Sequence, residues 1–292
     1  MTEAFESVML HDGRRLAVTQ FGTEAGTPVF YCHGFPGSRL EAALNAGAAY
    51  RAGIRLIAAD RPGYGQSDPQ HHRTLGDWGD DLNELADHYG IGRYRLFGVS
   101  GGAPFALAAA WRNGPRVAAV ALASGLGPLR RPRSRSWFAP FIRSNLPSLR
   151  YALRTLPARL LGRGPEAILE QMPLAAADQA VMARPEIKEC LFASYNEGMV
   201  QGIRGGALQD FYLYGHPWPF SPADIGVPVS IWHGNQDSIV PPASAAYYAG
   251  MIPGAKLHQL EDEGHFSLPV DRTDSIFSEL CDLGSTGAPS EQ

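Results

Sequence analysis

The chain contains 292 residues, of which 45% are hydrophobic and 18% are charged, and its net charge is −4. This length predicts one large domain, with or without an insertion, or two small domains. The negative charge argues against a general nucleic-acid-binding protein. No apolar run is long enough to cross a bilayer, so we expect no stable membrane insertion.

The three cysteines, Cys32, Cys190 and Cys281, are far apart and lack the spacing of metal ligands. Residues 1–10 are mixed in polarity and do not resemble a signal peptide. We therefore expect a cytoplasmic protein with reduced thiols, in which Cys32 is a core residue on a strand.

The first 126 residues alternate short apolar runs with helical patterns. A hairpin is expected over 6–21, turned at His11-Asp12-Gly13. Further strands are expected over 28–32, 55–59, 94–99 and 117–123. Helices are expected over 39–51 with Ser38 as N-cap, from Thr74 or Asp77 to residue 89, and over 103–111. Because the strands are continuously apolar, they predict a parallel sheet covered by helices on both faces.

No strand pattern appears between residues 127 and 220, where helical patterns cover 166–171, 176–184 and 186–196. The strand pattern then resumes at 228–233 and 256–260, with helices expected over 242–251 and 274–283. We predict a doubly wound, mostly parallel α/β sheet formed by 1–126 and 221–292, with 127–220 as a helical cap. An insertion that leaves the carboxyl ends of parallel strands lies over the crevice where such sheets bind ligands.

The stretch Gly98-Val99-Ser100-Gly101-Gly102 lies between an expected strand and an expected helix. In so tight a turn, side chains at positions 98 and 102 would collide with the neighbouring strand and helix. The turn would hold the Ser100 hydroxyl above the sheet edge in a strained backbone conformation, as in a nucleophile elbow. For this motif alone, a glycine-rich turn that merely contains a serine is an equal alternative.

A nucleophilic serine requires a base and an acid, and the same sheet edge offers both. His265 follows the last expected strand, and Asp237 follows the strand over 228–233, which gives the chain order Ser100, Asp237, His265. His33 and His233 each end a strand before a glycine, a position that more often braces a loop. Asp262 and Glu263 are too close to His265 in one loop to orient its ring well.

These motifs resemble the α/β-hydrolase superfamily with a cap domain, over about residues 7–283. The resemblance is strongest in the following motifs: His33-Gly34-Phe35-Pro36-Gly37-Ser38, Asp60-Arg61-Pro62-Gly63-Tyr64-Gly65-Gln66-Ser67, 98–102, 232–237 and Gly264-His265-Phe266. It implies that the backbone N–H groups of Phe35 and Gly101 form the oxyanion hole. Serine at the elbow separates the chain from the haloalkane dehalogenases and epoxide hydrolases, which carry aspartate there. Cofactor-free serine haloperoxidases are also similar, but they usually carry methionine where this chain has Gly101.

The residues predict a serine hydrolase that acts on a small carboxylic ester through an acyl-enzyme, with no metal or cofactor and no macromolecular partner. The alternatives are a ligand sensor with slow or single turnover, a cofactor-free peroxidase, or a hydrolase of lactones, amides or C–C bonds. The sequence leaves the substrate's identity and the oligomeric state open.

Two features of the insertion have more than one interpretation. Residues 129–163 contain nine arginines and no acid; a solvated basic face is favoured over steering of anionic substrates or contact with an anionic membrane. Five aromatic residues close the insertion, and we expect most to pack the cap onto the body and one or two to line the pocket: Phe211, Tyr212, Tyr214, Trp218 and Phe220.

Overall fold

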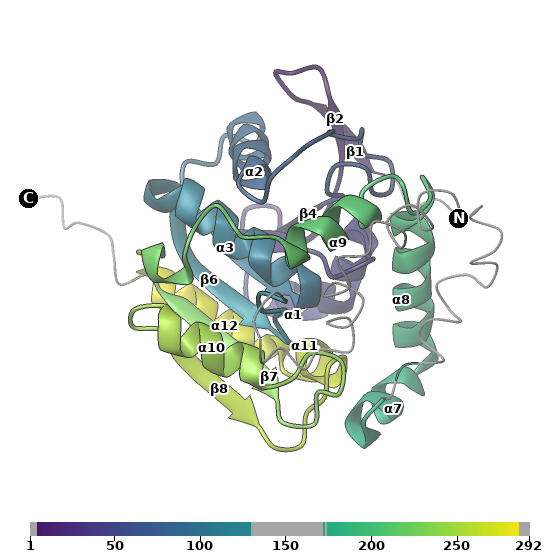
Figure 1. Ribbon diagram of the computed structural model, residues 1–292, viewed down its shortest axis with the longest axis vertical. Helices are drawn as coiled ribbons and strands as arrows, with labels where there is room; N and C mark the ends of the chain where they lie inside the picture. The colour runs from purple at the N-terminus through teal and green to yellow at the C-terminus, as the bar shows by residue number, and fades with distance from the viewer. Residues whose placement is uncertain (1–4, 130–171, 173, 286–292) are drawn as a thin grey trace, which may run out of the picture.

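The computed structural model describes residues 5–129, 172 and 174–285 (Figure 1). Its centre is an eight-stranded sheet in the order β1-β2-β4-β3-β5-β6-β7-β8. The strands are β1 (Glu6–Met9), β2 (Arg15–Gly22), β3 (Thr27–Cys32), β4 (Ile54–Ala59), β5 (Tyr94–Val99), β6 (Val117–Ala123), β7 (Val229–Gly234) and β8 (Lys256–Leu260). The pairs β1–β2 and β2–β4 are antiparallel and all others are parallel. The expected hairpin and the mostly parallel sheet are therefore confirmed.

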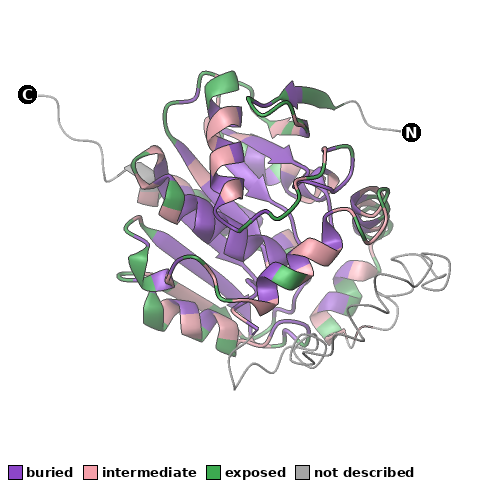
Figure 2. Ribbon diagram, turned by 45° about the horizontal axis from the view of Figure 1, so that its top comes forward, coloured by how far each residue is buried: buried purple, intermediate pink, exposed green. Residues whose placement is uncertain are grey.

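Helices cover both faces of the sheet, because successive strand residues point to opposite sides. On β3, Phe30 and Cys32 pack in the core beneath α2 (Asp77–His88), α3 (Ala103–Arg112) and α10 (Ala243–Met251). The alternate residues Val29 and Tyr31 pack in a second core beneath α1 (Ala46–Arg51) and α12 (Thr273–Ser285). Figure 2 shows the sheet buried between these helices, whose exposed residues face outward.

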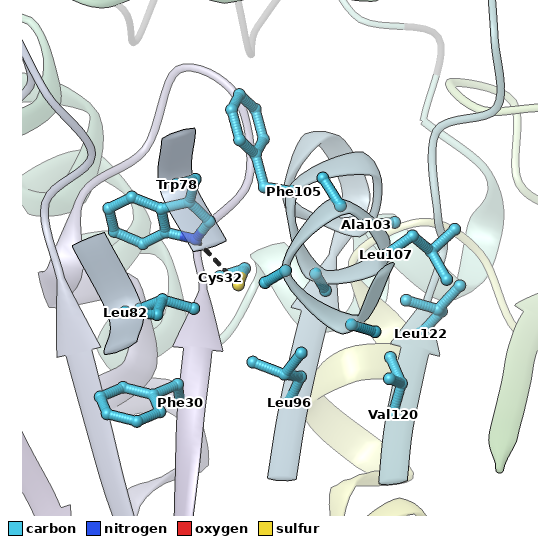
Figure 3. Close-up of a cluster of buried hydrophobic side chains, with 14 of the residues drawn as sticks. Phe30, Cys32, Trp78, Leu82, Leu96, Ala103, Phe105, Leu107, Val120 and Leu122 are labelled. Carbon is cyan, nitrogen blue, oxygen red and sulfur yellow. Dashed lines mark hydrogen bonds between the residues drawn. The ribbon is translucent and has the colours of Figure 1, made fainter. Parts of the chain in front are cut away.

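The core beneath α2 and α3 depends on small side chains in the centre of the sheet (Figure 3). A Cβ added to Gly98 would lie 2.8 Å from the Cβ of Ala106, so α3 approaches β5 too closely for any larger residue. Cys32 is fully buried on β3 as expected, and its sulfur accepts a hydrogen bond from the indole N–H of Trp78 at 3.5 Å. This close contact between α3 and β5 holds the turn that joins them in place.

The structure differs from the expected elements at residues 39–51. This segment is a 3₁₀ helix, η1 (Arg39–Asn45), followed by α1, and Ser38 caps η1 by accepting a hydrogen bond from the N–H of Leu40. The side chain of Asn45 donates to the carbonyl of Pro269 and to the hydroxyl of Thr273 at the junction. A long-range contact therefore accompanies the break between the two helices.

The described part of the insertion between β6 and β7 contains three α-helices: α7 (Ala176–Met182), α8 (Pro185–Gly198) and α9 (Ala207–Gly215). The first two were expected, whereas α9 and the short α11 (Ser267–Asp271) were not. The remaining short elements are 3₁₀ turns: η2 (Ser100–Gly102), η3 (Gly114–Arg116) and η4 (Pro222–Asp224). The helix expected over 166–171 and the arginine-rich segment from residue 130 onward lie outside the described residues.

In Figure 1, α7 and α8 lie along the right-hand side of the molecule, whereas α9 lies nearer its centre. Helix α8 packs against η1, and α7 packs against α11. The boundaries of a cap at 127 and 220 stay a prediction. No helix in the described ranges has the length and apolar character needed to cross a membrane.

Candidate active site

Ser100 lies in the turn between β5 and α3 with a backbone φ of 50°, a left-handed conformation that is costly for a residue with a side chain. The neighbouring glycines make this turn possible. A Cβ on Gly102 would lie 1.9 Å from the carbonyl oxygen of Cys32, and one on Gly98 would meet α3. The turn therefore has the geometry that the sequence predicts for a nucleophile elbow.

The structure brings Ser100, His265 and Asp237 together at the carboxyl ends of β5, β8 and β7. The hydroxyl of Ser100 lies 3.0 Å from Nε2 of His265, and Nδ1 of His265 lies 2.8 Å from Oδ2 of Asp237. The other carboxylate oxygen of Asp237 accepts hydrogen bonds from the N–H groups of Ile239 (2.9 Å) and Val240 (2.8 Å). These contacts form one continuous chain of hydrogen bonds from a buried carboxylate to a serine.

Electrostatic interactions in the site shift the pKa values of Asp237 and His265 in opposite directions. Burial alone would raise the pKa of Asp237, but the facing rings of His265 and His233 hold it well below its usual value. Burial alone would lower the pKa of His265, but nearby carboxylates, chiefly that of Asp237, outweigh this effect, and the net shift is upward. Asp237 is thus an anion that favours a positive charge on the His265 ring.

The residues predicted to form the oxyanion hole lie side by side. A Cβ built on Gly101 would be 3.2 Å from the backbone nitrogen of Phe35 and 2.6 Å from the hydroxyl of Tyr214. Tyr214, on α9, donates a hydrogen bond to the carbonyl of Gly101 at 2.9 Å. An inserted helix therefore helps to fix the backbone beside Ser100.

A buried carboxylate holds the loop that carries Phe35 in place. Glu41 accepts a hydrogen bond from the hydroxyl of Tyr31 (2.8 Å) and hydrogen bonds from the N–H of Gly34 (3.2 and 3.1 Å to its two oxygens). Burial raises the pKa of Glu41. Nδ1 of His33 contacts the carbonyl of Gly34, and its Nε2 accepts the backbone N–H of Arg61, so His33 braces this loop as expected.

A cavity of about 850 Å³, counting its open mouth, lies over Ser100 and His265. Most of its lining is apolar, with contributions from Leu44, Leu126, Leu191, Phe211, Ile239 and Val270. The polar side chains besides Ser100 and His265 are Glu41, Asn45 and the tyrosines at 31, 195 and 214. Of the five aromatic residues that close the insertion, Phe211 and Tyr214 line this cavity.

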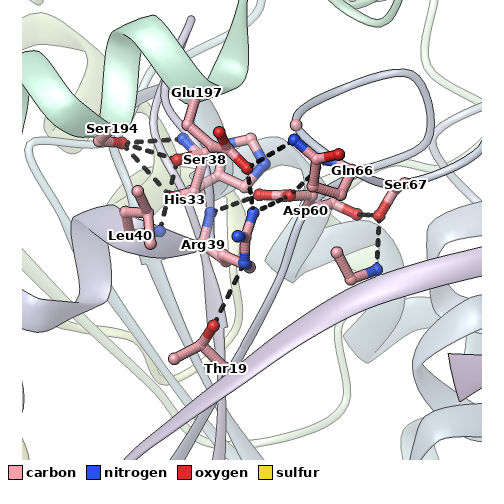
Figure 4. A network of polar contacts seen from close by, with 12 residues as sticks. Thr19, His33, Ser38, Arg39, Leu40, Asp60, Gln66, Ser67, Ser194 and Glu197 are labelled. Atoms are coloured by element: carbon pink, nitrogen blue, oxygen red, sulfur yellow. Dashed lines mark hydrogen bonds and ion pairs between the residues drawn. The ribbon is translucent and has the colours of Figure 1, made fainter. Parts of the chain in front are cut away.

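Two buried polar networks attach the inserted helices to the body. Figure 4 shows the guanidinium of Arg39 between Asp60 (2.5 Å) and Glu197 on α8 (2.8 Å), while the hydroxyl of Ser194 accepts the N–H of Ser38 at 2.9 Å. On α9, Asp210 accepts hydrogen bonds from Nε of Arg61 (2.9 Å) and from the hydroxyl of Tyr64 (2.8 Å), and it also pairs with Arg73. Charged groups without exposure to solvent are costly unless paired, so both networks favour one seating of these helices.

The rejected candidates for base and acid occupy other places. Asp262 is exposed, and Glu263 is turned toward Arg272, which it contacts at 2.5 Å. Nε2 of His233 lies 2.8 Å from the carbonyl of Val240 and 3.3 Å from Asp237, so its ring supports the acid. Among the residues that the structure describes, no group of three or more His, Cys, Asp or Glu side chains is arranged to hold a metal ion.

Three residues of the site were missed by sequence reasoning. The sequence marks Tyr214 only as one of five aromatic residues at the end of the insertion, and its motifs single out neither Glu41 nor Asp178. Asp178 is fully buried and accepts the backbone N–H of His265. An acid near the start of a helix is common in any sequence, so no local signal distinguishes Glu41 or Asp178.

Comparisons with known proteins identify the family to which the fold belongs. The family model described as "alpha/beta hydrolase fold" matches residues 27–271. A curated relative, the dihydrolipoyllysine-residue acetyltransferase component of the acetoin cleaving system of Pseudomonas putida, is 29% identical over 259 residues. That match covers 87% of this chain but only 62% of the relative's length.

Solved structures share the fold at low identity. An esterase from Exiguobacterium antarcticum superposes with a TM-score of 0.72 at 19% identity, covering 96% of this chain and 99% of its own. The enol-lactonase from Burkholderia xenovorans gives a TM-score of 0.69 at 20% identity, covering 95% and 99%. The family match spans most of the chain and includes Ser100, Asp237 and His265, and on this basis the chain belongs to the α/β hydrolase fold family.

Proposed function

We propose that the protein is a hydrolase of small carboxylic esters. Ser100 is its nucleophile, His265 is its general base, and the carboxylate of Asp237 orients the His265 ring. The observation that carries this proposal is the unbroken chain of hydrogen bonds from Asp237 through His265 to Ser100, at 2.8 and 3.0 Å. The strained backbone of Ser100 supports it, because such strain persists mainly where function requires it.

The reaction proceeds in two acyl transfers. His265 Nε2 takes the proton of Ser100 as its oxygen attacks the ester carbonyl, and the negative charge on the carbonyl oxygen is held by the N–H groups of Phe35 and Gly101. The protonated His265 then gives its proton to the departing alcohol. A water molecule, deprotonated by His265, attacks the acyl-enzyme and releases the acid, which restores the Ser100 hydroxyl.

The cavity favours a small, mainly apolar acyl or alkyl group. Its lining is mostly hydrocarbon, as is usual for sites that bind small molecules, and only a few polar groups lie beside Ser100 and His265. The carboxyl group of Glu41, which also lines the cavity, disfavours substrates that carry a negatively charged group beside it.

A p-nitrophenyl ester series of increasing chain length tests the proposal, beside amide, lactone and epoxide panels. We expect steady hydrolysis of short esters, and loss of hydrolysis and of Ser100 labelling by a fluorophosphonate probe in Ser100→Ala. Ser244→Ala, which alters a serine on α10, is the matched control and should retain activity. Near wild-type esterase activity in Ser100→Ala would refute the assignment.

A second candidate is transfer of the acyl group to an acceptor other than water. The observation that favours it is the 29% identity to a Pseudomonas putida protein named as an acetyltransferase component. Steady-state assays with an acetyl ester and a small thiol decide between the two. A thioester product formed in preference to acetate would favour transfer, whereas acetate alone would favour hydrolysis.

A further inference from the structure

Asp178 is a buried carboxylate that the proposed mechanism does not use. It lies in the first turn of α7 and is fully inaccessible to solvent. Its Oδ2 accepts the N–H of His265 at 2.9 Å, and its Oδ1 accepts those of Phe266 (2.8 Å) and Ser267 (3.0 Å). Both oxygens of one acid from the insertion therefore bind the chain segment that carries the candidate base.

We propose that Asp178 is a positioning residue, through which the inserted helix α7 holds the His265 segment in its reactive place and adds a negative charge beside the ring. The inference rests on the proposed function, because it assigns His265 the role of base. If it holds, the reactivity of Ser100 depends on the position of the inserted helix α7 relative to the His265 segment.

The local chain is shaped to receive this carboxylate. A Cβ on Gly264 would lie 2.4 Å from Oδ1 of Asp178, so only glycine allows the acid to approach the backbone. The N–H of Gly264 is bound by the hydroxyl of Ser267 at 2.8 Å. Four consecutive backbone N–H groups, from residue 264 to residue 267, are thus bound by two side chains, which leaves this segment little freedom to move.

The partners of the Asp178 carboxylate are backbone N–H groups. Among the described side chains, no Lys, Arg or His forms an ion pair with Asp178, and its hydrogen bonds come from the backbone. Hydrogen bonds from N–H groups to a carboxylate stabilise its charged form. The charge of Asp178 is therefore not cancelled by a neighbouring cation within the described structure.

The groups that face His265 come from several elements. Asp237 follows β7, Glu41 lies on η1, Asp178 lies on α7, and all three raise the pKa of His265 against the opposing effect of burial. On its own segment, the Glu263 carboxylate is paired with Arg272. Nε2 of His233 lies 3.3 Å from Oδ2 of Asp237, the same oxygen that contacts His265.

The seating of α7 depends on the rest of the insertion. The helix packs against both α11 and α8, and α8 is attached to the body through Ser194 and Glu197. Displacement of α7 would remove three hydrogen bonds from the His265 segment at once. Precise placement matters to catalysis, since a displacement of 1 Å can lower a rate about 100-fold.

The test measures how fast Ser100 reacts with a fluorophosphonate probe between pH 5 and pH 9, in about half-unit steps chosen to bracket the usual titration of histidine. The Ser100 oxygen forms a bond to phosphorus, fluoride departs, and the serine proton passes to His265. The rate rises with pH as His265 loses its proton, so the midpoint of the rise reports the pKa of His265. This readout requires no natural substrate.

Asp178→Asn should lower the plateau labelling rate about 10- to 100-fold and move the midpoint to lower pH. The rate falls because an amide cannot accept all three N–H groups in the same geometry. The midpoint moves because loss of the negative charge makes the protonated ring less stable. Asp178→Glu retains the charge but places a longer side chain at a fully buried position. Its rate should therefore fall, while its midpoint stays closer to that of the wild type.

Asp81→Asn is the matched control, because Asp81, on α2, is also buried and accepts hydrogen bonds from Arg14. It should lower the melting temperature and leave the labelling rate and midpoint unchanged. A wild-type rate in Asp178→Asn, or a lowered rate with an unmoved midpoint, overturns the proposal. If Asp178→Asn does not fold, a wild-type rate in Asp178→Glu overturns it. Failure of the wild type to be labelled would instead overturn the proposed function, and this inference with it.

Discussion

Replacement of Asp237 by asparagine is the sharpest test of the proposed triad, because the structure indicates how the new amide will orient. Oδ1 of Asp237 accepts two backbone N–H groups, from Ile239 and Val240, at 2.9 and 2.8 Å. In Asp237→Asn the amide oxygen should keep this position, since an NH₂ group there would face two donors. The NH₂ group must then point at Nδ1 of His265.

This orientation should place the histidine in the unproductive tautomer. With an N–H donor opposite it, Nδ1 becomes an acceptor and the ring proton moves to Nε2, which then cannot take the proton of Ser100. The variant also loses the negative charge that raises the pKa of His265. By analogy with triads altered in this way, kcat should fall about 10²- to 10⁴-fold, which corresponds to about 3–5 kcal/mol in the activation free energy.

The assay is the steady-state hydrolysis of a short p-nitrophenyl ester, with circular dichroism to show that each variant is folded. Asp262→Asn is the control, since Asp262 is exposed in the loop just before His265. It should change kcat less than about 3-fold, as is usual for exposed positions outside the site. A larger loss in Asp262→Asn than in Asp237→Asn would require the triad to be redrawn.

Three further outcomes follow from the same geometry. Gly102→Ala should lower the free energy of unfolding, measured in urea, by more than about 2 kcal/mol, because its Cβ would lie 1.9 Å from the carbonyl oxygen of Cys32. Gly92→Ala is the control, since the space around its Cβ is open, and it should change this free energy by less than about 1 kcal/mol. Ester hydrolysis should rise with pH through a midpoint above 6.5, since the reactive form of His265 is neutral and its pKa is raised; a midpoint well below 6.5 would contradict this electrostatic assignment. Turnover should continue for many cycles per active site, whereas a burst of one equivalent followed by almost no product on every ester tried would indicate a ligand sensor.

The sheet could be predicted from the sequence because its signals are local. Continuously apolar runs such as 94–99 and 117–123 are typical of strands buried on both faces, and parallel strands of this kind require helices between them. The elbow was also local, since the glycines at 98 and 102 lie within two residues of Ser100. The order of Ser100, Asp237 and His265 could be predicted because each follows a strand, and the carboxyl ends of parallel strands meet at one edge.

The contacts of the insertion could not be predicted in this way. Asp178 and His265 are 87 residues apart, and their hydrogen bond exists only because α7 lies against α11. Tyr214 likewise reaches Gly101 across 113 residues. Nothing in the local pattern of either residue distinguishes it from an ordinary helix acid or a packing aromatic.

In residues 39–51, both the local sequence and long-range contacts determine the structure. Their composition and the Ser38 cap determine that the segment is helical, but the division into η1 and α1 occurs at Asn45, which donates hydrogen bonds to Pro269 and Thr273. Thus the sequence by itself determined the strands, the elbow and the chain order of the candidate triad, because these depend on neighbouring residues and on the rules of parallel sheets. Only the tertiary structure decided which distant side chains hold the site, because a hydrogen bond between segments depends on how helices dock rather than on the residues beside it.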